Sequence, residues 1–372
     1  MVFGAAALVA LATLLGLMTR LVATPPTGGS PQSSSVAAAG GASGSPQSTS
    51  FAEATPGPSP SPSAIGAPSS SLQPTPSPHP TATAAPTARP TPRPTPRPTP
   101  RPTPRPTTGA WPSIGHIYEI VFENHEVGSI IGNRTAPYIN GLARRFGLAT
   151  NYTAVSHPSL PNYLALWSGS TQGVTDDGVH NFTRGRTLAD QIAASGRSWH
   201  VAAENVPLGC FKGATASDGE DGPGDYARKH EPAISWTSVS TSPSRCAHIT
   251  DFTHFRPGLG NFWFIVPNLC HDMHDCSVAT GDAWLRGFLP GILGSAAFRK
   301  DGLIVLTFDE GSSDIGGGGK VATIVISPKA RTAFVSGHAH NHYSLVRTIE
   351  ALWRMPCMAN SCSANTLREF FP

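Results

Sequence analysis

A long stretch with few large apolar side chains determines which part of this 372-residue chain can fold. From Thr24 to about Ala110 the sequence consists mainly of Pro, Ser, Thr, Ala and Gly, and most of the 37 prolines lie before residue 111. Such a composition cannot bury enough apolar surface to offset the entropy lost on folding. We therefore expect residues 24–110 to be a disordered linker and residues 111–372 to be a folded domain with one core.

The end of the linker repeats Arg-Pro-Thr-Pro between Ala88 and Pro106. Dense proline favours extended polyproline II structure, which rises ~3.1 Å per residue and makes a semi-rigid stalk. Residues 1–110 hold six arginines and one glutamate, a net charge of +5, so the remainder carries −2 of the overall +3. A slightly acidic domain gives no support for a nucleic acid as a specific partner.

Residues 1–23 begin with an apolar run from Val2 to Met18. This run is long for the apolar part of a signal peptide and short for a membrane span, so a cleaved signal peptide and an uncleaved membrane anchor both stay open. Either one predicts an extracytoplasmic protein, secreted or attached to the membrane or cell wall through this segment and the stalk.

Six cysteines lie in the expected domain, at Cys210, Cys246, Cys270, Cys276, Cys357 and Cys362. An even number of cysteines in an exported chain is typical of disulfides. The last four form two pairs that are close in sequence and would close short loops, which leaves the first two for each other. That pairing is one of fifteen, and free buried thiols are the alternative.

Apolar strands alternate with helices along residues 111–372. We expect strands at 116–122, 199–203, 261–266, 303–308 and 321–326, and helices at 136–146, 188–194, 282–293 and 343–353. The segment 209–257 is expected to be rich in loops. Continuous apolar strands that alternate with helices are typical of a mostly parallel sheet covered on both faces, so the expected fold class is α/β.

Polar side chains with metal-binding groups follow the expected strands. They are Glu123 and Asn124, then Asp272 and His274, then Asp309 and Glu310, and finally His342 before the last helix. Active sites of such sheets lie at the carboxyl ends of the strands, so these side chains are expected to meet. Neighbouring carboxylates there favour a divalent metal ion, Ca, Mg, Mn or Zn. The ordinary alternative places them in turns, helix caps and solvated loops.

Ser159 lies in a segment whose second half is apolar with helical spacing. Pro161 favours a helix that starts nearby, with Ser159 just before its N-terminus. The free N–H groups and the dipole there favour an oxyanion, which makes the hydroxyl a candidate nucleophile for phosphoryl transfer. An N-cap role is the alternative. The glycines at 316–319 indicate a flexible loop rather than a phosphate cradle, because no Walker lysine pattern is present.

Five ordered blocks in 111–372 resemble the bacterial phosphoesterase family, which holds acid phosphatases and non-specific phospholipases C. The blocks are Phe122–His125, Ala136–Asn140, Ala154–Tyr163, Thr307–Gly311 and Asn341–Glu350. That family looks like part of the alkaline-phosphatase superfamily, which implies an alkaline-phosphatase-like three-layer sandwich around a central, mostly parallel sheet. The run Ser-Leu-Pro-Asn also looks like the Thr-Phe-Pro-Asn of nucleotide pyrophosphatases, where Thr is the nucleophile.

The resemblance implies roles for particular residues. The metal ligands would be Glu123, Asn124, Ser159, Asp309 and Glu310, with Ser159 also the nucleophile. Asp272, His274 and His342 are candidates for a second metal or phosphate site. Asn124 would stabilise phosphate oxygens, and His157 or His342 would bind phosphate or protonate the leaving group. Glu310 stands where two-zinc relatives have His.

The expected function is that of an exported, metal-dependent hydrolase of phosphate esters, acting through a phosphoseryl intermediate. An acid-phosphatase-like phosphomonoesterase is favoured over a phospholipase C-like diesterase, because the chain ends soon after the last block. A head-group transferase stays open, and so does a function of another class, a non-catalytic surface-binding module on a long stalk.

Overall fold

The structure is a computed structural model and describes residues 109–217 and 225–372. The expected signal peptide or anchor, residues 1–23, and the linker up to residue 108 lie outside the described residues. Among those that are described, no helix is long and apolar enough to cross a membrane.

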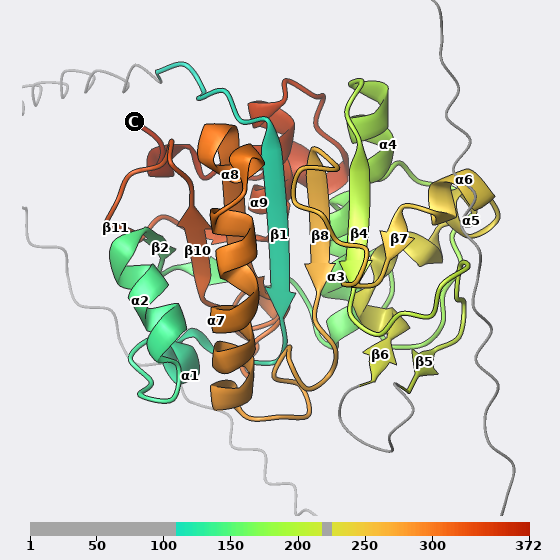
Figure 1. The fold of residues 1–372 in the computed structure, drawn as a ribbon, viewed down its shortest axis with the longest axis horizontal. Coiled ribbons are helices and arrows are strands. Elements are labelled where there is room, and N and C mark those ends of the chain that lie inside the picture. The colour runs from blue at the N-terminus through green and yellow to red at the C-terminus, as the bar shows by residue number, and fades with distance from the viewer. Residues whose placement is uncertain (1–108, 218–224) are drawn as a thin grey trace, which may run out of the picture. The chain divides into compact units, whose positions relative to one another are not determined.

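An eight-stranded sheet lies at the centre of the described residues, with the strand order β11-β2-β10-β9-β1-β8-β4-β7 (Figure 1). Its strands are β1 (His116–Phe122), β2 (Gly147–Ala149), β4 (Trp199–Ala203), β7 (Ile249–Thr250), β8 (Phe262–Val266), β9 (Gly302–Phe308), β10 (Thr323–Ile326) and β11 (Phe334–Ser336). β10 runs antiparallel to β2 and β9, and the other neighbouring pairs are parallel. The mostly parallel sheet expected from the sequence is confirmed.

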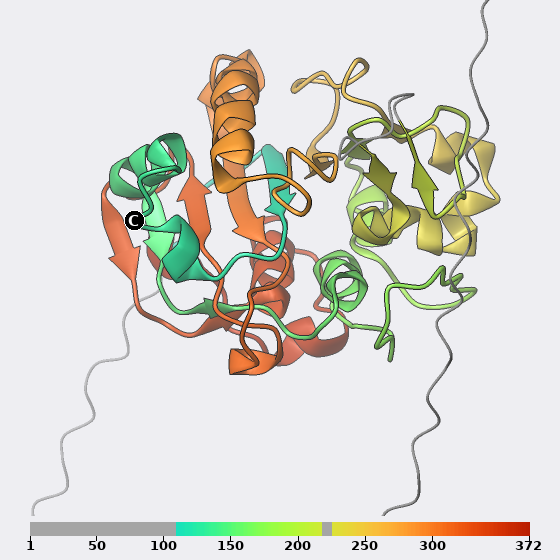
Figure 2. The same ribbon diagram turned by 90° about the horizontal axis from the view of Figure 1, so that it is seen from below.

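Helices cover both faces of this sheet (Figures 1 and 2). One face carries α1 (Val127–Ile130), α2 (Pro137–Arg145), α7 (Val278–Leu293) and α8 (Ala296–Asp301), and the other carries α3 (Ser159–Ser168), α4 (Leu188–Ala194) and α9 (His342–Leu352). The chain therefore has the α/β fold, with three layers, that its sequence predicts. The carboxyl ends of β1, β8 and β9 meet at one edge of the sheet, where the polar clusters of the sequence were expected.

Short elements extend this framework. They are β3 (Tyr152–Thr153) paired with β12 (His340–Asn341), β5 (Thr215–Ala216) paired with β6 (Tyr226–Ala227), helices α5 (Thr237–Ser240) and α6 (Pro243–Cys246), and the 3₁₀ helices η1 (Arg228–His230), η2 (Pro232–Ser235), η3 (Ile315–Gly317), η4 (Ala359–Ser363) and η5 (Arg368–Phe370). Many of them fall in the segment 209–257 that was expected to be loop-rich. α7 begins earlier than expected because the Ser277 side chain accepts a hydrogen bond from Thr280 N and caps it.

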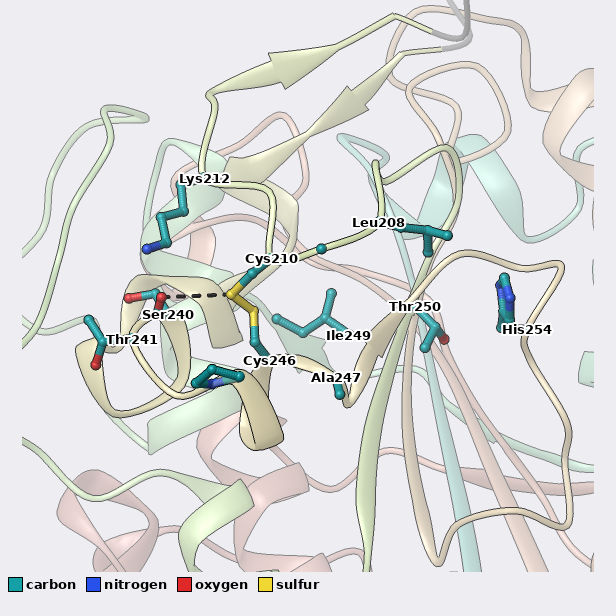
Figure 3. Close-up of a pocket in the computed structure, with 12 residues that line it drawn as sticks. Leu208, Cys210, Lys212, Ser240, Thr241, Cys246, Ala247, Ile249, Thr250 and His254 are labelled. Atoms are coloured by element: carbon teal, nitrogen blue, oxygen red, sulfur yellow. Dashed lines mark hydrogen bonds between the residues drawn. A yellow bond between two sulfur atoms is a disulfide. The ribbon is translucent and has the colours of Figure 1, made fainter.

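The six cysteines form three disulfides, Cys210–Cys246, Cys270–Cys276 and Cys357–Cys362, as the sequence spacing predicted. The first lies beside a cavity of about 690 Å³ between the chain near Leu208 and α6 (Figure 3). Among the described residues that line this cavity there is no carboxylate. The cavity is therefore separate from the clustered acidic groups at the strand ends.

Glu119 is a buried carboxyl group in the middle of β1, and neither of its oxygens has a hydrogen-bond partner. Burial alone raises the pKa of Glu119 well above its ordinary value, so the group is held neutral. A buried polar group without a partner destabilises a fold. Glu350, in contrast, is buried in α9 but accepts hydrogen bonds from Ser361 Oγ at 3.0 and 2.8 Å.

We expect Glu119→Leu to raise the free energy of unfolding by about 1–3 kcal/mol, since it removes an unsatisfied polar group at similar volume. The folded-state pKa of Glu119 lies above the unfolded value, so the wild type loses stability as pH rises from the unfolded pKa through the folded one. The increase in the free energy of unfolding caused by Glu119→Leu should therefore be larger at pH 8 than at pH 5, as measured by urea unfolding. Glu350→Leu is the control and should destabilise the protein, and a gain at Glu119 that does not grow with pH would contradict the interpretation.

Candidate active site

Three carboxylates meet at the carboxyl ends of β1, β8 and β9. Glu123 follows β1, Asp272 lies in the loop after β8, and Asp309 follows β9, and all three are fully buried. Backbone hydrogen bonds hold these segments together, from Glu123 N to Asp272 O at 2.9 Å and from Asp309 N to Phe122 O at 2.8 Å. The predicted convergence of these strand-end residues is therefore present in the structure.

The three carboxylates have strongly altered acidities. Burial raises the pKa of Glu123 well above its ordinary value, and the charges of Asp309 and Asp272 raise it further. Burial likewise raises the pKa of Asp272 well above its ordinary value, and burial with the charge of Glu310 raises the pKa of Asp309 to about 7. Each carboxylate also keeps one buried oxygen without a hydrogen-bond partner, namely Glu123 Oε1, Asp272 Oδ2 and Asp309 Oδ2.

Ser159 is the first residue of α3 and lies against this cluster. Its Oγ donates a hydrogen bond to Glu123 Oε2 at 3.0 Å, and the side chain is buried. The helix begins at Ser159 itself with Pro158 as the N-cap residue, and no side chain caps this end. The alternative that Ser159 is an N-cap is therefore wrong, and its hydroxyl faces the carboxylates instead.

The backbone before Ser159 is held by the Asn162 side chain and by the glycines at 316–319. The Asn162 side chain accepts hydrogen bonds from Val155 N at 3.0 Å and Ser156 N at 3.1 Å, and donates one to Ser156 O at 2.8 Å. The glycines at 316–319 pack directly on the same backbone, since a Cβ added at Gly317 would lie 2.6 Å from Val155 O. The prediction that these glycines form a flexible loop is wrong, because they allow two chain segments to approach closely.

Asn124 and Glu310 flank Asp309. Asn124 has a φ of 55°, in the left-handed region, and its backbone N–H donates to Asp309 Oδ1 at 3.1 Å. Glu310 is paired with His157, whose Nδ1 lies 2.7 Å from Glu310 Oε2. Burial lowers the pKa of His157, but its contacts with Ser313 O and Glu310 outweigh burial and raise that pKa above its ordinary value. His157 therefore tends to carry a proton beside the cluster.

His342 lies beneath Asp309, with both ring nitrogens next to protein atoms. Its Nε2 is 2.5 Å from Asp309 O, and its Nδ1 is 3.3 Å from the Tyr152 hydroxyl. Burial lowers the pKa of His342 to about 4. The geometry thus suits support of the Asp309 backbone, and it leaves neither nitrogen open for the second metal or the phosphate that the sequence suggested.

His230 and Lys229, both in η1, belong to the site and were missed by the sequence interpretation. The His230 ring stacks on Tyr163, with its Nε2 3.2 Å from Glu123 Oε1 and its Nδ1 3.2 Å from Asp272 Oδ2. Lys229 Nζ lies 3.0 Å from Asp177 Oδ2 and 3.3 Å from His274 Nε2. No local signal marks these residues, because they follow no expected strand and lie in a segment expected to be loops.

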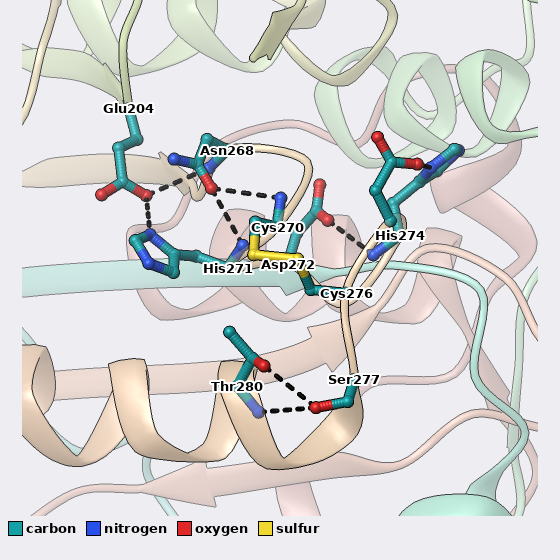
Figure 4. Close-up of a disulfide and its surroundings, with 10 residues drawn as sticks. Glu204, Asn268, Cys270, His271, Asp272, His274, Cys276, Ser277 and Thr280 are labelled. Atoms are coloured by element: carbon teal, nitrogen blue, oxygen red, sulfur yellow. Dashed lines mark hydrogen bonds and ion pairs between the residues drawn. A yellow bond between two sulfur atoms is a disulfide. The ribbon is translucent and has the colours of Figure 1, made fainter. Parts of the chain in front are cut away.

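Asp272 and His274 are presented by the loop that the Cys270–Cys276 disulfide closes (Figure 4). His274 N donates to Asp272 Oδ1 at 2.8 Å, which fixes the turn between them. Ligand atoms of His274, Glu123 and His230 all lie within 4.8 Å of one another. Burial, with the charges of Lys229 and His274, lowers the pKa of His230 well below its ordinary value, so its imidazole is neutral and able to bind a metal.

These residues fit a divalent cation. Ligand atoms of Glu123, His230 and His274 lie close enough to hold one ion, and a cation there would offset the charge of the neighbouring Asp272 and Asp309 carboxylates. The donors combine hard carboxylate oxygens with two imidazoles, a set that manganese and zinc accept better than calcium does.

Comparison with known proteins gives consistent matches. The model of the Phosphoesterase family matches residues 126–356. An acid phosphatase of Aspergillus fumigatus is 32% identical over 236 residues, 61% of this chain and 53% of that protein, so the chain spans about half the length of this relative. A phosphatidylinositol-3-phosphatase of Mycobacterium tuberculosis is 32% identical over 263 residues, 70% of this chain and 84% of that protein.

Among solved structures, a protein in the alkaline phosphatase superfamily from Vibrio parahaemolyticus aligns with 12% identity and a TM-score of 0.44, covering 67% of this chain and 71% of that one. A phosphonate monoester hydrolase from Silicibacter pomeroyi aligns with 10% identity and a TM-score of 0.46, covering 69% and 76%.

We expect Mn²⁺ to raise the melting temperature of the chelator-treated full chain by several degrees, because saturation at a hundred times Kd adds about 2.7 kcal/mol. Asp309→Asn should raise the melting temperature without metal, since it removes one buried charge, and should abolish most of the Mn²⁺ shift. Differential scanning fluorimetry measures both effects. Asp251→Asn, on a loop outside the cluster, should keep the wild-type shift, and an unchanged shift in Asp309→Asn would rule out this ligand assignment.

Proposed function

The chain belongs to the phosphoesterase family, and we propose that residues 111–372 form an exported, metal-dependent phosphomonoesterase that acts through Ser159. The observation that carries this proposal is the contact between the Ser159 hydroxyl and a buried carboxylate cluster, 3.0 Å from Glu123. The relatives named acid phosphatase and phosphatidylinositol-3-phosphatase favour monoesters over diesters as substrates.

Ser159 is the proposed nucleophile. Its Oγ attacks phosphorus in line with the leaving oxygen, a P–O bond to serine forms, and the bond to the leaving group breaks. The hydroxyl proton departs along its hydrogen bond to Glu123. Water then hydrolyses the phosphoseryl intermediate and releases phosphate. Because Ser159 opens α3, the helix dipole favours the negative charge that gathers there.

The cation would be held by Glu123, Asp309 and Asp272, together with His230 and His274, and the resemblance adds Asn124, Ser159 and Glu310. When bound, a divalent cation supplies positive charge that favours the deprotonated serine and offsets the charge of the phosphate. Among Ca, Mg, Mn and Zn, a mixture of carboxylate oxygens and imidazole nitrogens favours Mn or Zn.

Lys229 is proposed to bind the substrate. Asp177 holds Lys229 Nζ through one carboxylate oxygen and accepts from Leu160 N at 2.9 Å through the other, so the ammonium is fixed beside the start of α3. A cation in that position suits a non-bridging phosphate oxygen. His157 was expected to bind phosphate or protonate the leaving group, but its Nδ1 lies 2.7 Å from Glu310 Oε2 and its Nε2 3.1 Å from Ser313 O, so its proposed role is to hold Glu310 in place.

Export is part of the proposal. Three disulfides support an oxidising location outside the cytoplasm. Residues 1–23 would serve as signal peptide or anchor, and the proline-rich linker would hold the catalytic domain away from the membrane or cell wall. Disulfides in small loops such as Cys270–Cys276 would also fix the segment that carries Asp272 and His274.

Ser159→Ala should lower kcat for a chromogenic phosphomonoester by at least about a thousandfold, because it removes the nucleophile. Ser168→Ala, at the other end of α3, is the matched control and should keep near wild-type kcat. Rapid quenching with ³²P-labelled substrate should trap a phosphoprotein in the wild type and none in Ser159→Ala. Turnover in Ser159→Ala at the wild-type rate would refute the assignment of the nucleophile.

Lys229→Met should raise KM for a phosphomonoester by roughly tenfold or more, since a charge-assisted hydrogen bond contributes about 1.5–3 kcal/mol. The effect on a phosphodiester, which has one negative charge fewer, should be smaller. Steady-state kinetics on both esters measure the difference. Lys212→Met is the control, because the Lys212 side chain is exposed. Equal losses on both esters would argue against recognition of the monoester dianion, and faster wild-type turnover of the diester would favour a diesterase.

A further inference from the structure

Two histidines and a glutamate meet between the segment that leads into α9 and the C-terminal helix η5. His340 Nε2 lies 2.6 Å from Glu369 Oε1, and His338 Nδ1 lies 3.8 Å from the same oxygen. One ligand atom from each of the three residues lies within 4.8 Å of the others. None of the three belongs to the carboxylate cluster around Ser159, so this is a separate group of potential metal ligands.

One short segment carries both histidines. His338 lies at a bend between β11 and β12, and His340 is the first residue of β12. β12 pairs with β3 through His340 and Tyr152, and His340 N donates to Asn151 O at 3.0 Å. The bend at His338 and the start of β12 at His340 thus bring two imidazoles toward one carboxylate oxygen.

Glu369 is held in place before any ion arrives. Ser336 Oγ donates to Glu369 Oε1 at 2.8 Å. Its backbone neighbours are anchored on both sides, because Arg331 N donates to Phe370 O at 2.8 Å and Leu367 N donates to Thr348 Oγ1 at 2.9 Å. Burial raises the pKa of Glu369, but hydrogen bonds to His340 and Ser336 outweigh burial and keep that pKa below its ordinary value, so the carboxylate is charged.

The group is open to solvent on one side. His340 is almost fully buried, whereas the His338 side chain is 75% exposed. A cavity of about 480 Å³ is lined by His338, His340 and Asn365 among others. An ion from solution can therefore reach the three ligand atoms, and water can occupy a fourth position.

We propose that His338, His340 and Glu369 form a second metal site, selective for zinc. Two imidazoles and one carboxylate, with an open fourth position, are a ligand set that zinc prefers and that magnesium and calcium bind weakly. The carboxylate is bonded by Ser336, which matches the second layer of hydrogen bonds that orients ligands in metal sites. The ordinary alternative is a hydrogen-bonded His340–Glu369 pair beside a solvated His338, and it predicts no bound zinc.

Zinc at this position would link two distant parts of the chain. Glu369 lies three residues before the last position described, and His338 and His340 precede α9. Because an ion that binds only the folded state stabilises it by mass action, the site would fasten η5 to the strand β12. The proposal does not rest on the proposed phosphatase function, since the two sites share no ligand.

The test measures Zn²⁺ binding to the full chain by competition with a chromogenic chelator, with the metal alone as probe. Wild type should bind one Zn²⁺ more per chain than His338→Gln and Glu369→Gln, or bind that ion at least tenfold more tightly. His254→Gln is the matched control, because His254 is also exposed and paired with a carboxylate, 2.6 Å from Asp251 Oδ1. It should bind as many ions as the wild type, and the rate of phosphoester hydrolysis should be the same in all four proteins.

A second measurement separates this site from the carboxylate cluster. In the Asp309→Asn background, Zn²⁺ should still raise the melting temperature, and adding His338→Gln should remove that shift. His338 is exposed, so its substitution leaves the core intact and decides the question even where Glu369→Gln folds poorly. Equal numbers and affinities of bound Zn²⁺ in wild type, His338→Gln and Glu369→Gln would overturn the proposal, whatever the phosphatase activity of the chain.

Discussion

The burial of Glu123, Asp272 and Asp309 at one edge of the sheet is the constraint on which the catalytic end of this protein depends. Each keeps an oxygen without a hydrogen-bond partner. Burial raises the pKa of all three, and the charges of Asp309 and Asp272 raise the pKa of Glu123 further. An uncompensated cluster of buried carboxylates destabilises a fold, and a cation bound among them would offset that cost.

The chain builds the rest of the site around that cluster from segments that are far apart in sequence. Asn162 and the glycines at 316–319 fix the backbone before α3, so the first residue of the helix, Ser159, reaches Glu123. On the opposite side η1 supplies His230 between two of the carboxylates. The start of α3, the ends of the strands and η1 thus contribute side chains to one cluster.

The sequence predicted the parts of the site that follow from periodicity and from parallel-sheet geometry. Residues directly after apolar strands, such as Glu123 and Asp309, could be placed together because the carboxyl ends of parallel strands share an edge. His230 could not be placed, because its position depends on stacking with Tyr163 and on the packing of a segment whose elements are short and follow no sequence period. The glycines at 316–319 were misinterpreted for a related reason. Their composition indicates conformational freedom, and only the fold shows that they pack closely against the backbone at Val155.

The segment that ends at α9 connects the two groups of metal ligands that the structure brings together. His340 contacts Glu369, and two residues later His342 contacts the backbone oxygen of Asp309. Between them Asn341 caps α9, because its side chain accepts from Ser344 N at 3.2 Å, so the backbone cannot shift at one histidine and stay fixed at the other. An ion held by His338, His340 and Glu369 would therefore also restrain the residue that supports Asp309, which gives a zinc site far from the nucleophile a physical route to the stability of the catalytic cluster.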